Sequence, residues 1–248
     1  GYFLACQCRP GEDMQLSLPT RNHIPAVITG KENLSPTVVS LFVSPRFPVS
    51  YSPGQYLTLW ASEHLARPCY LASVEGLDNR LSFHVERRIN GAFSSWAHDC
   101  TAIGQKISIS DLNGENICDI LPTPRQFIAQ GSCLAPLLAA CRHLSAQGSE
   151  SISSNRPLTV AIQANHPDEI YCLDELQRLA DIYEFFSVVT FTGSGSQSGL
   201  LKYLASLSGE QQFAASGDRK FIKRIVAEVN SNDELKAASL IELPYSVD

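Results

Sequence analysis

The chain changes character at Pro122-Thr123-Pro124, and this change constrains the fold more than any other feature. Before it, residues 22–118 contain short segments rich in β-branched residues, separated by turn signals such as Pro53-Gly54 and Asn113-Gly114. From residue 126 on, short apolar segments alternate with segments of helical periodicity. The first pattern predicts a small antiparallel β barrel, and the second predicts an α/β domain with a parallel sheet and helices on both faces.

The same patterns predict the positions of the individual elements. In the first part we expect one short helix at 91–98 and strands at 26–29, 37–43, 55–60, 80–86 and 106–110. In the second part we expect strands at 126–130, 158–163, 186–191 and 212–215, and helices at 134–146, 172–184, 199–207 and 218–229. Ligands of such sheets bind at the carboxyl ends of the strands. The predicted functional edge therefore consists of the loops 131–136, 164–168, 193–198 and 216–218.

Composition excludes several classes of protein. The net charge of -6 argues against general affinity for nucleic acid, which needs a basic surface. No run of 18 apolar residues is present, so we expect no membrane-spanning helix, and no secretory signal precedes the barrel. The eight cysteines are scattered without a CxxC pair, which favours reduced, buried thiols and a cytoplasmic protein over a zinc ribbon or a disulfide scaffold.

Four segments carry the functional signal, and Ser216-Gly217-Asp218 before the last predicted helix continues it. These segments are Pro53–Tyr56, Arg67–Ser73, His84–Trp96 and Gly131–Pro136. In this order and spacing they resemble the ferredoxin–NAD(P)H reductase superfamily. The resemblance implies a six-stranded antiparallel flavin-binding barrel at 20–121, followed by a parallel-sheet NAD(P)-binding domain at 125–248.

The resemblance also implies that the barrel binds FAD. Arg67 would meet the pyrophosphate, and the helix start at Gly91 and Ser94 would cradle it. Cys69 and Tyr70 stand where the family has its stacking Tyr and the following Ser. Successive strand residues point to opposite faces, so Tyr70 replaces the stacking ring only if the strand bulges. The alternative makes Arg67 a surface ion-pair residue and Tyr70 part of the barrel core. The full set of implied flavin contacts is Arg67, Cys69, Tyr70, Leu71, His84, Val85, Gly91, Phe93 and Ser94.

The second domain carries the implied NAD(P)H contacts. Cys133 replaces the second glycine of the family's nicotinamide-facing loop. The alternative makes this segment an ordinary strand-to-helix turn of an α/β domain. Ser216 stands at the position of a nicotinamide-side Cys, and we name it only as a contact because hydride transfer needs no side-chain acid or base. Asn165 replaces a nucleotide-binding Arg. The implied contacts are Gly131, Ser132, Cys133, Pro136, Asn165, Ser216, Gly217 and Asp218.

Residues 1–19 match neither pattern and resemble the end of a plant-type [2Fe–2S] ferredoxin domain. In that resemblance Cys6 takes the place of the last cluster ligand. The C-x4-C-x2-C group that supplies the other three ligands is not in the sequence. We therefore expect a [2Fe–2S] cluster in a longer parent protein and none in this chain alone.

The favoured hypothesis is an electron-transfer oxidoreductase. It would pass a hydride from NAD(P)H to FAD, and then single electrons to a [2Fe–2S] centre or to a redox protein such as an oxygenase component. The rival is a binding or regulatory module that keeps the fold without turnover. It is favoured by the substitutions at Cys69, Cys133 and Ser216, and by Asp111-Leu112, which stand where the family has the Gly-Pro of a Gly-Pro-x-Gly turn. A third hypothesis keeps the flavin and takes electrons from a protein. No hypothesis includes nucleic acid or a membrane as a partner.

Overall fold

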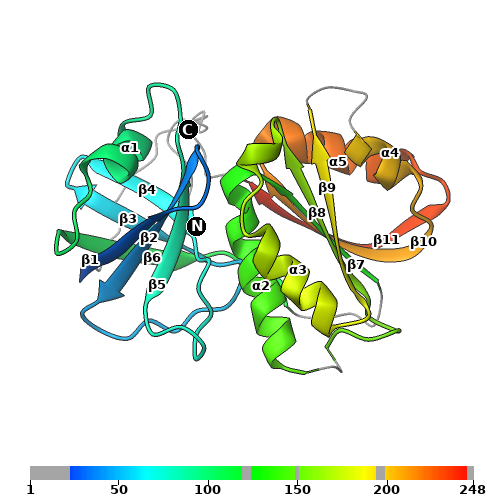
Figure 1. The fold of residues 1–248 in the computed structure, drawn as a ribbon, viewed down its shortest axis with the longest axis horizontal. Helices are drawn as coiled ribbons and strands as arrows, with labels where there is room; N and C mark the ends of the chain where they lie inside the picture. The colour runs from blue at the N-terminus through cyan, green and yellow to red at the C-terminus, as the bar shows by residue number, and fades with distance from the viewer. Residues whose placement is uncertain (1–22, 119–123, 149–150, 194–198, 245–248) are drawn as a thin grey trace, which may run out of the picture.

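The computed structural model describes residues 23–118, 124–148, 151–193 and 199–244, which form two neighbouring sheets (Figure 1). The first sheet is antiparallel, with its strands in the order β4-β3-β6-β1-β2-β5. Its strands are β1 (Ile24–Asn33), β2 (Val38–Pro45), β3 (Tyr56–Ser62), β4 (Leu65–Tyr70), β5 (Leu81–Glu86) and β6 (Lys106–Asn113). The edge strands approach each other just beyond β4, where Leu71 bridges Phe83 and the Ala72 N–H donates to the Ser82 carbonyl at 2.8 Å. The sheet is therefore a nearly closed barrel, which confirms the predicted six-stranded antiparallel architecture.

The only helical segment of the described barrel residues covers one end of the barrel. It consists of α1 (Ala92–Ser95) and the π-helical turn η2 (Trp96–Cys100), close to the predicted helix at 91–98. Its side chains Phe93, Trp96 and Ala97 join the barrel core around Leu41 and Phe83. Burial of this apolar side explains why a segment with so little helical length keeps its position.

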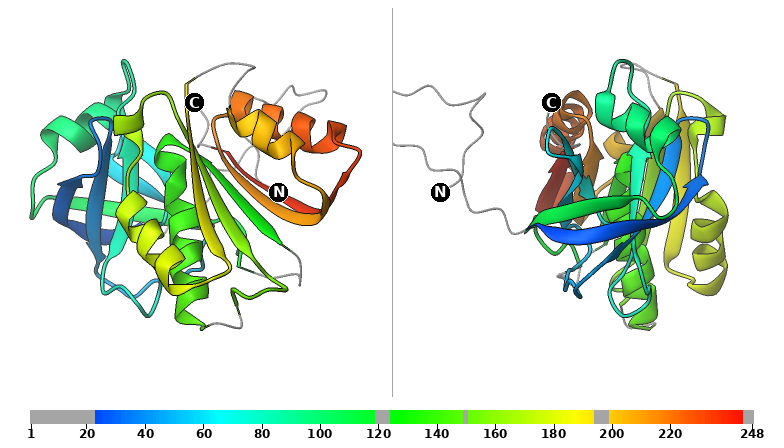
Figure 2. Two further views of the ribbon diagram at one scale, coloured as in Figure 1. Left: turned by 45° about the vertical axis from the view of Figure 1, so that its right-hand side comes forward. Right: turned by 90° about the vertical axis from the view of Figure 1, so that its left-hand side faces the viewer.

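The second sheet is parallel, in the order β11-β10-β7-β8-β9. Its strands are β7 (Arg125–Gln130), β8 (Leu158–Ala164), β9 (Phe186–Thr192), β10 (Gly209–Gly217) and β11 (Leu235–Pro244). The helices α2 (Leu134–Ala146) and α3 (Leu173–Ile182) cover one face, and α4 (Gly199–Ala205) and α5 (Arg219–Ser231) cover the other (Figure 2). This arrangement confirms the predicted α/β fold.

Strand β11 was not predicted. Its sequence contains one β-branched residue, Ile241, and shows no clear alternation of apolar and polar residues. Parallel pairing with β10 along nearly its whole length holds it in the sheet. The strand therefore depends on this pairing more than on local propensity.

The two parts of the molecule are packed against each other along α2, which lies between the two sheets in Figure 1. Arg142 of α2 donates to both carboxylate oxygens of Asp78 in the barrel, each at 2.8 Å. His84 of β5 and Tyr171 are joined by a 3.1 Å hydrogen bond between the imidazole Nδ1 and the phenol oxygen. The core of the α/β part also includes Val38 of the barrel. These contacts fix the relative position of the two sheets and the shape of the space between them.

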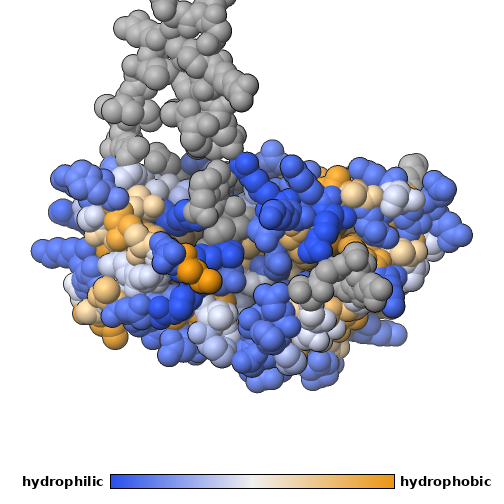
Figure 3. All heavy atoms as spheres, turned by 90° about the horizontal axis from the view of Figure 1, so that it is seen from above, coloured by the Kyte–Doolittle hydropathy of each residue, from blue (hydrophilic) through white to orange (hydrophobic). Residues whose placement is uncertain are grey.

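The described residues on one face of the molecule form no large continuous apolar area (Figure 3). The face shown in Figure 3 is largely hydrophilic, with separate small hydrophobic areas. Within the described ranges, no helix has both the length and the hydropathy to cross a bilayer.

Candidate functional site

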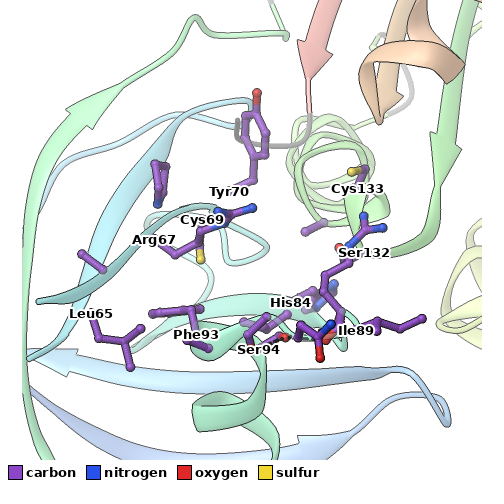
Figure 4. A pocket seen from close by; sticks show the side chains of 18 residues that line it. Leu65, Arg67, Cys69, Tyr70, His84, Ile89, Phe93, Ser94, Ser132 and Cys133 are labelled. Carbon is purple, nitrogen blue, oxygen red and sulfur yellow. Dashed lines mark hydrogen bonds between the residues drawn. The ribbon is translucent and has the colours of Figure 1, made fainter. Parts of the chain in front are cut away.

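A cleft of about 390 Å³ lies where the barrel meets the α/β part (Figure 4). One wall comes from β4, a second from β5 and the loop leading into α1, and the third from the turn before α2. Its lining is Leu65–Tyr70, His84, Val85, Arg88–Ser94, Ser132, Cys133 and Ala135. Its volume lies within the range typical of sites for small molecules and cofactors. Segments far apart in the sequence thus converge on one cavity.

Two guanidinium groups, those of Arg67 and Arg88, give the cleft its positive charge. Arg67 comes from the middle of β4, where it is paired with Leu59 of β3. The loop that carries Arg88 is held by Ser94, whose hydroxyl accepts from the Arg88 N–H at 3.0 Å and donates to the Gly91 carbonyl at 3.0 Å. Guanidinium groups on a fixed backbone suit a phosphate or diphosphate ligand.

Cys69 and Tyr70 lie on opposite faces of β4, as the alternation of strand residues predicts. The pairing of β4 with β3 is regular from Arg67 to Tyr70, so no bulge brings the two side chains together. Cys69 is buried with the barrel core, and this burial raises the pKa of its thiol to about 12. In Figure 4 the Cys69 sulfur lies on the side of Phe93, away from Tyr70. At neutral pH the cleft therefore contains a protonated thiol at the position where the resemblance has a stacking Tyr, and Tyr70 does not replace that ring from the same face.

The Tyr70 ring forms the wall of the cleft next to α2, opposite Cys133 (Figure 4). It makes an edge contact with Tyr56, with 5.4 Å between the ring centroids. Its hydroxyl donates to the carbonyl of Pro244 at the end of β11, at 3.3 Å. Tyr70 therefore links the barrel to the sheet of the second part, and it is packed partly against the core of that part.

His84 is neutral in the folded protein. It points outward from β5 towards Tyr171, with 5.3 Å between the two rings. Burial, together with the nearby positive charge of Arg142, lowers the pKa of His84 to about 3. The pKa of His84 is therefore lower in the folded chain than in the unfolded chain. Such a group favours the folded state above the pKa of the unfolded chain, and this stabilisation is lost as the pH falls towards the pKa of the folded chain.

We expect His84→Gln to make the protein less sensitive to acid. Between pH 6.5 and about 3 the unfolded chain binds a proton at His84 that the folded chain does not bind, so wild-type stability falls over this interval. At pH 5 this contribution is on the order of 1–2 kcal/mol. Urea unfolding of both proteins at pH 7.5 and pH 5 would measure it, and an equal loss in both would contradict the assignment. His143→Gln serves as the control, because His143 is half-buried on α2 and does not line the cleft.

The turn that opens α2 faces the cleft from the other side. Gly131 has a left-handed φ of 56°, a conformation that favours glycine. Cys133 is only 3% exposed, and burial raises the pKa of its thiol well above the ordinary value. The Ser216 hydroxyl is completely buried and donates to the Leu243 carbonyl at 3.2 Å. The turn thus has a glycine where the backbone needs one, and a buried thiol two residues later.

The comparisons with known proteins agree with this geometry. No family model matches the chain. The xylene/toluene monooxygenase electron transfer component XylA of Pseudomonas putida is 28% identical over 187 residues, which are 72% of this chain and 52% of that protein. The ferredoxin–NAD(+) reductase component of the alkene monooxygenase system of Xanthobacter autotrophicus is 26% identical over 233 residues, or 88% of this chain and 68% of that protein. The chain is a homologue of the reductase components of oxygenase systems.

A solved structure shares the fold of this chain. The Amycolatopsis cytochrome P450 reductase GcoB superimposes with a TM-score of 0.78 at 18% identity, over 98% of this chain and 78% of that one. The fold expected from the resemblance to the ferredoxin–NAD(P)H reductase superfamily is thereby confirmed. The chain spans about half to two thirds of the length of the curated relatives named above.

Most of the predicted flavin contacts line the cleft of this chain. They are Arg67, Cys69, Tyr70, His84, Val85, Gly91, Phe93 and Ser94, joined by Ser132 and Cys133 from the nicotinamide set. Leu71 does not line it, because its side chain is fully buried in the barrel core. The Ser94 hydroxyl is engaged with its own loop, so that residue positions the loop through these bonds.

The other predicted nicotinamide contacts lie at the same end of the sheet without lining the cleft. Pro136 is buried in α2, and Asn165 follows β8 on the surface. Gly217 ends β10, and Asp218 caps α5 by accepting from the Phe221 N–H at 2.7 Å. Cys6 lies outside the described residues. Among those that are described, no group of three or more His, Cys, Asp or Glu side chains could hold a metal ion.

Glu86, Arg88 and Tyr171 belong to the surroundings of the cleft but were not predicted as site residues. Glu86 forms a 3.3 Å ion pair with Arg88, and its carboxylate lies next to Gly131 and Ser132. The alternation in β5 could have identified Glu86, since Ser82, His84 and Glu86 share its outward face. Nothing local in the sequence indicates that this face is covered by the second domain.

Proposed function

We propose that the chain is the FAD- and NAD(P)H-binding part of an electron-transfer reductase, with the barrel at 20–121 binding the flavin and residues 125–248 binding the nucleotide. The observation that carries this proposal is the cleft of about 390 Å³, which both parts line. When bound there, FAD would accept a hydride from NAD(P)H and release the electrons singly to a redox partner. The fold and the homology to oxygenase reductases support this proposal.

The residues of this chain would bind and orient the two cofactors. Arg67 and Arg88 would neutralise the FAD pyrophosphate, because both guanidinium groups border the cleft. Val85 and Phe93 give the barrel side an apolar surface against which a flat ring system can pack. The turn at Gly131–Cys133 would face the dinucleotide across the cleft. No side chain is needed as an acid or base in this proposal.

The electron acceptor in this proposal is a [2Fe–2S] centre of a longer parent protein or a separate redox protein, such as an oxygenase component. The names of the relatives support it, since two of them are components of monooxygenase systems. The proposal includes a cytoplasmic location. The cysteines among the described residues are free thiols, which suits a reducing compartment.

Two observations favour the rival, a module of the same fold that binds a partner without redox turnover. Tyr70 crosses towards Pro244, and the buried Cys133 replaces a glycine of the family's loop, so both reduce the space on the nicotinamide side. If this chain binds a flavin but has no room for a nicotinamide, the third hypothesis applies, in which another protein supplies the electrons.

Absorbance spectroscopy distinguishes these functions. We expect the purified chain to take up FAD in stoichiometric amount and to show a flavin spectrum, which NADH or NADPH bleaches under anaerobic conditions. A protein that takes up no FAD would support the binding module and contradict the reductase. Flavin that binds but is not bleached by either nucleotide would support electron supply from a protein.

A further inference from the structure

Glu86 is held at the junction between the barrel and the opening turn of α2. It is the last residue of β5, and its side chain leaves the strand on the face that the second domain covers. A Cβ atom placed on Gly131 would lie only 2.7 Å from the Glu86 Oε2 atom. The Ser132 hydroxyl donates to the same oxygen at 3.4 Å, and the Ser132 backbone also hydrogen-bonds this carboxylate. The carboxylate therefore packs directly on the Gly131–Ser132 backbone.

This backbone is the part of the sheet edge most suited to an anionic ligand. Gly131–Cys133 forms the turn between β7 and the thirteen-residue helix α2, at the carboxyl end of a central strand. In open α/β sheets such turns bind the phosphates of dinucleotides, because the first N–H groups of the helix are unpaired and its dipole favours negative charge. In this chain a carboxylate of the barrel already lies against that turn.

The charges around Glu86 leave it only partly compensated. Arg88 is its cationic partner at 3.3 Å, on the loop that follows β5. The other ionisable groups that face it are Glu169 of the turn η4 (Pro167–Glu169), the Cys133 thiol and the Tyr171 phenol. Burial raises the pKa of Glu86, and the negative charge of Glu169 adds to this rise. Arg88 and the hydrogen bonds from Ser132 act in the opposite direction. A protonated or absent carboxylate would therefore leave the turn available to another anion.

We propose that Glu86 lowers the affinity of this chain for the dinucleotide. Its carboxylate lies against the Gly131–Cys133 turn as an internal anion, so the NAD(P)H pyrophosphate must either displace it or bind next to its negative charge. This inference rests on the proposed function, and it identifies a residue that controls nucleotide binding at the same site. The pyrophosphate brings two negative charges close to a half-buried carboxylate, where Coulomb repulsion is stronger than in water. Loss of the carboxylate charge then strengthens binding.

Two consequences can be measured. Glu86→Gln keeps the size of the side chain and an oxygen that accepts from Ser132, but it removes the charge. We expect it to bind a dinucleotide more tightly by on the order of tenfold at pH 7.5, which corresponds to about 1.4 kcal/mol. In the wild type, affinity should rise as the pH falls through the raised pKa of Glu86, and this rise should be missing in Glu86→Gln.

The experiment is a calorimetric titration of the FAD-saturated chain with ADP-ribose, which carries the pyrophosphate and both riboses but no nicotinamide. Wild type and Glu86→Gln are compared at pH 5.5, 6.5 and 7.5, together with their thermal unfolding midpoints. The matched control is Asp99→Asn, which also removes one carboxylate and one arginine partner, since Asp99 pairs with Arg87 at 2.7 Å on the exposed side of the same region. The control should bind ADP-ribose like the wild type.

The outcomes separate the inference from the proposed function. Tighter binding by Glu86→Gln, with a flattened pH profile, supports the inference. Equal affinities for ADP-ribose and parallel pH profiles in all three proteins overturn the inference. An equal increase in affinity in Asp99→Asn overturns it too. Neither result contradicts the reductase proposal. A purely structural role for Glu86 would change the unfolding midpoint without changing the pH profile, which also overturns it. Failure of every protein to bind ADP-ribose or to be reduced by NADH overturns the proposed nucleotide function itself.

Discussion

Replacement of Arg67 by alanine is expected to weaken FAD binding by about a hundredfold, or roughly 2.7 kcal/mol. The Arg67 guanidinium borders the cleft from a paired strand, so it is positioned before the ligand arrives. Charge-assisted hydrogen bonds to a diphosphate are among the strongest single contacts that a side chain can make. Quenching of flavin fluorescence during titration of the apoprotein measures the dissociation constant directly.

Two further variants make this result specific. Arg67→Lys keeps the charge but loses the planar fork, so its affinity should fall between those of the wild type and Arg67→Ala. Arg46→Ala removes an arginine that stacks on Phe47 elsewhere on the barrel, and it should bind FAD like the wild type. Arg67→Ala with unchanged FAD affinity and an unchanged unfolding midpoint would show that no diphosphate lies beside β4. The assignment of the cleft to FAD would then be wrong.

The fold could be predicted from the sequence wherever local pattern and tertiary context agree. The helix expected at 134–146 begins and ends at the residues observed for α2, because a continuous apolar face is buried there. Strand β11 escaped prediction since parallel pairing with β10, and not its own composition, makes it a strand. In β5, predicted as a strand at 80–86, Leu81, Phe83 and Val85 alternate with polar residues and lie in the barrel core.

The candidate site could be predicted only as far as its segments are marked by motifs. Arg67 and Gly91 were found because they lie in recognisable segments, and both line the cleft. Ser216 lies in such a segment too, yet its side chain is turned into the core beside Leu243, which no sequence spacing indicates. Glu86 was missed because its importance arises from a contact with Gly131, a residue of the other domain. Contacts between domains depend on docking, and docking is not encoded in a local pattern.

One such contact holds the two domains together. Arg142 of α2 makes a two-pronged ion pair with Asp78 of the barrel and a second ion pair with Glu175 of α3, at 3.3 Å. It also donates to the Ala72 carbonyl at 3.5 Å. Its side chain is 27% exposed, so the three charges are only partly solvated. Removal of the arginine would leave the Asp78 and Glu175 carboxylates partly desolvated without a cationic partner, which is unfavourable.

Arg142→Ala is therefore expected to lower the free energy of unfolding by about 2–3 kcal/mol and the thermal midpoint by about 5 °C or more. Asp78 and Glu175 would face each other across the domain junction without a cation, so the barrel and the second domain would dock less tightly. Urea unfolding measures the loss of stability. Hydrogen exchange should show faster exchange of the backbone amides in α2 and β5. The control is Arg178→Ala. Arg178 is an exposed residue of α3 whose side chain donates to the Asp174 carbonyl at 3.1 Å, and its replacement should change the free energy of unfolding by less than about 0.5 kcal/mol. If the two variants unfold alike, the Arg142 ion pairs do not hold the domains together, and the cleft owes its shape to the apolar contacts around Val38 and to the His84–Tyr171 bond.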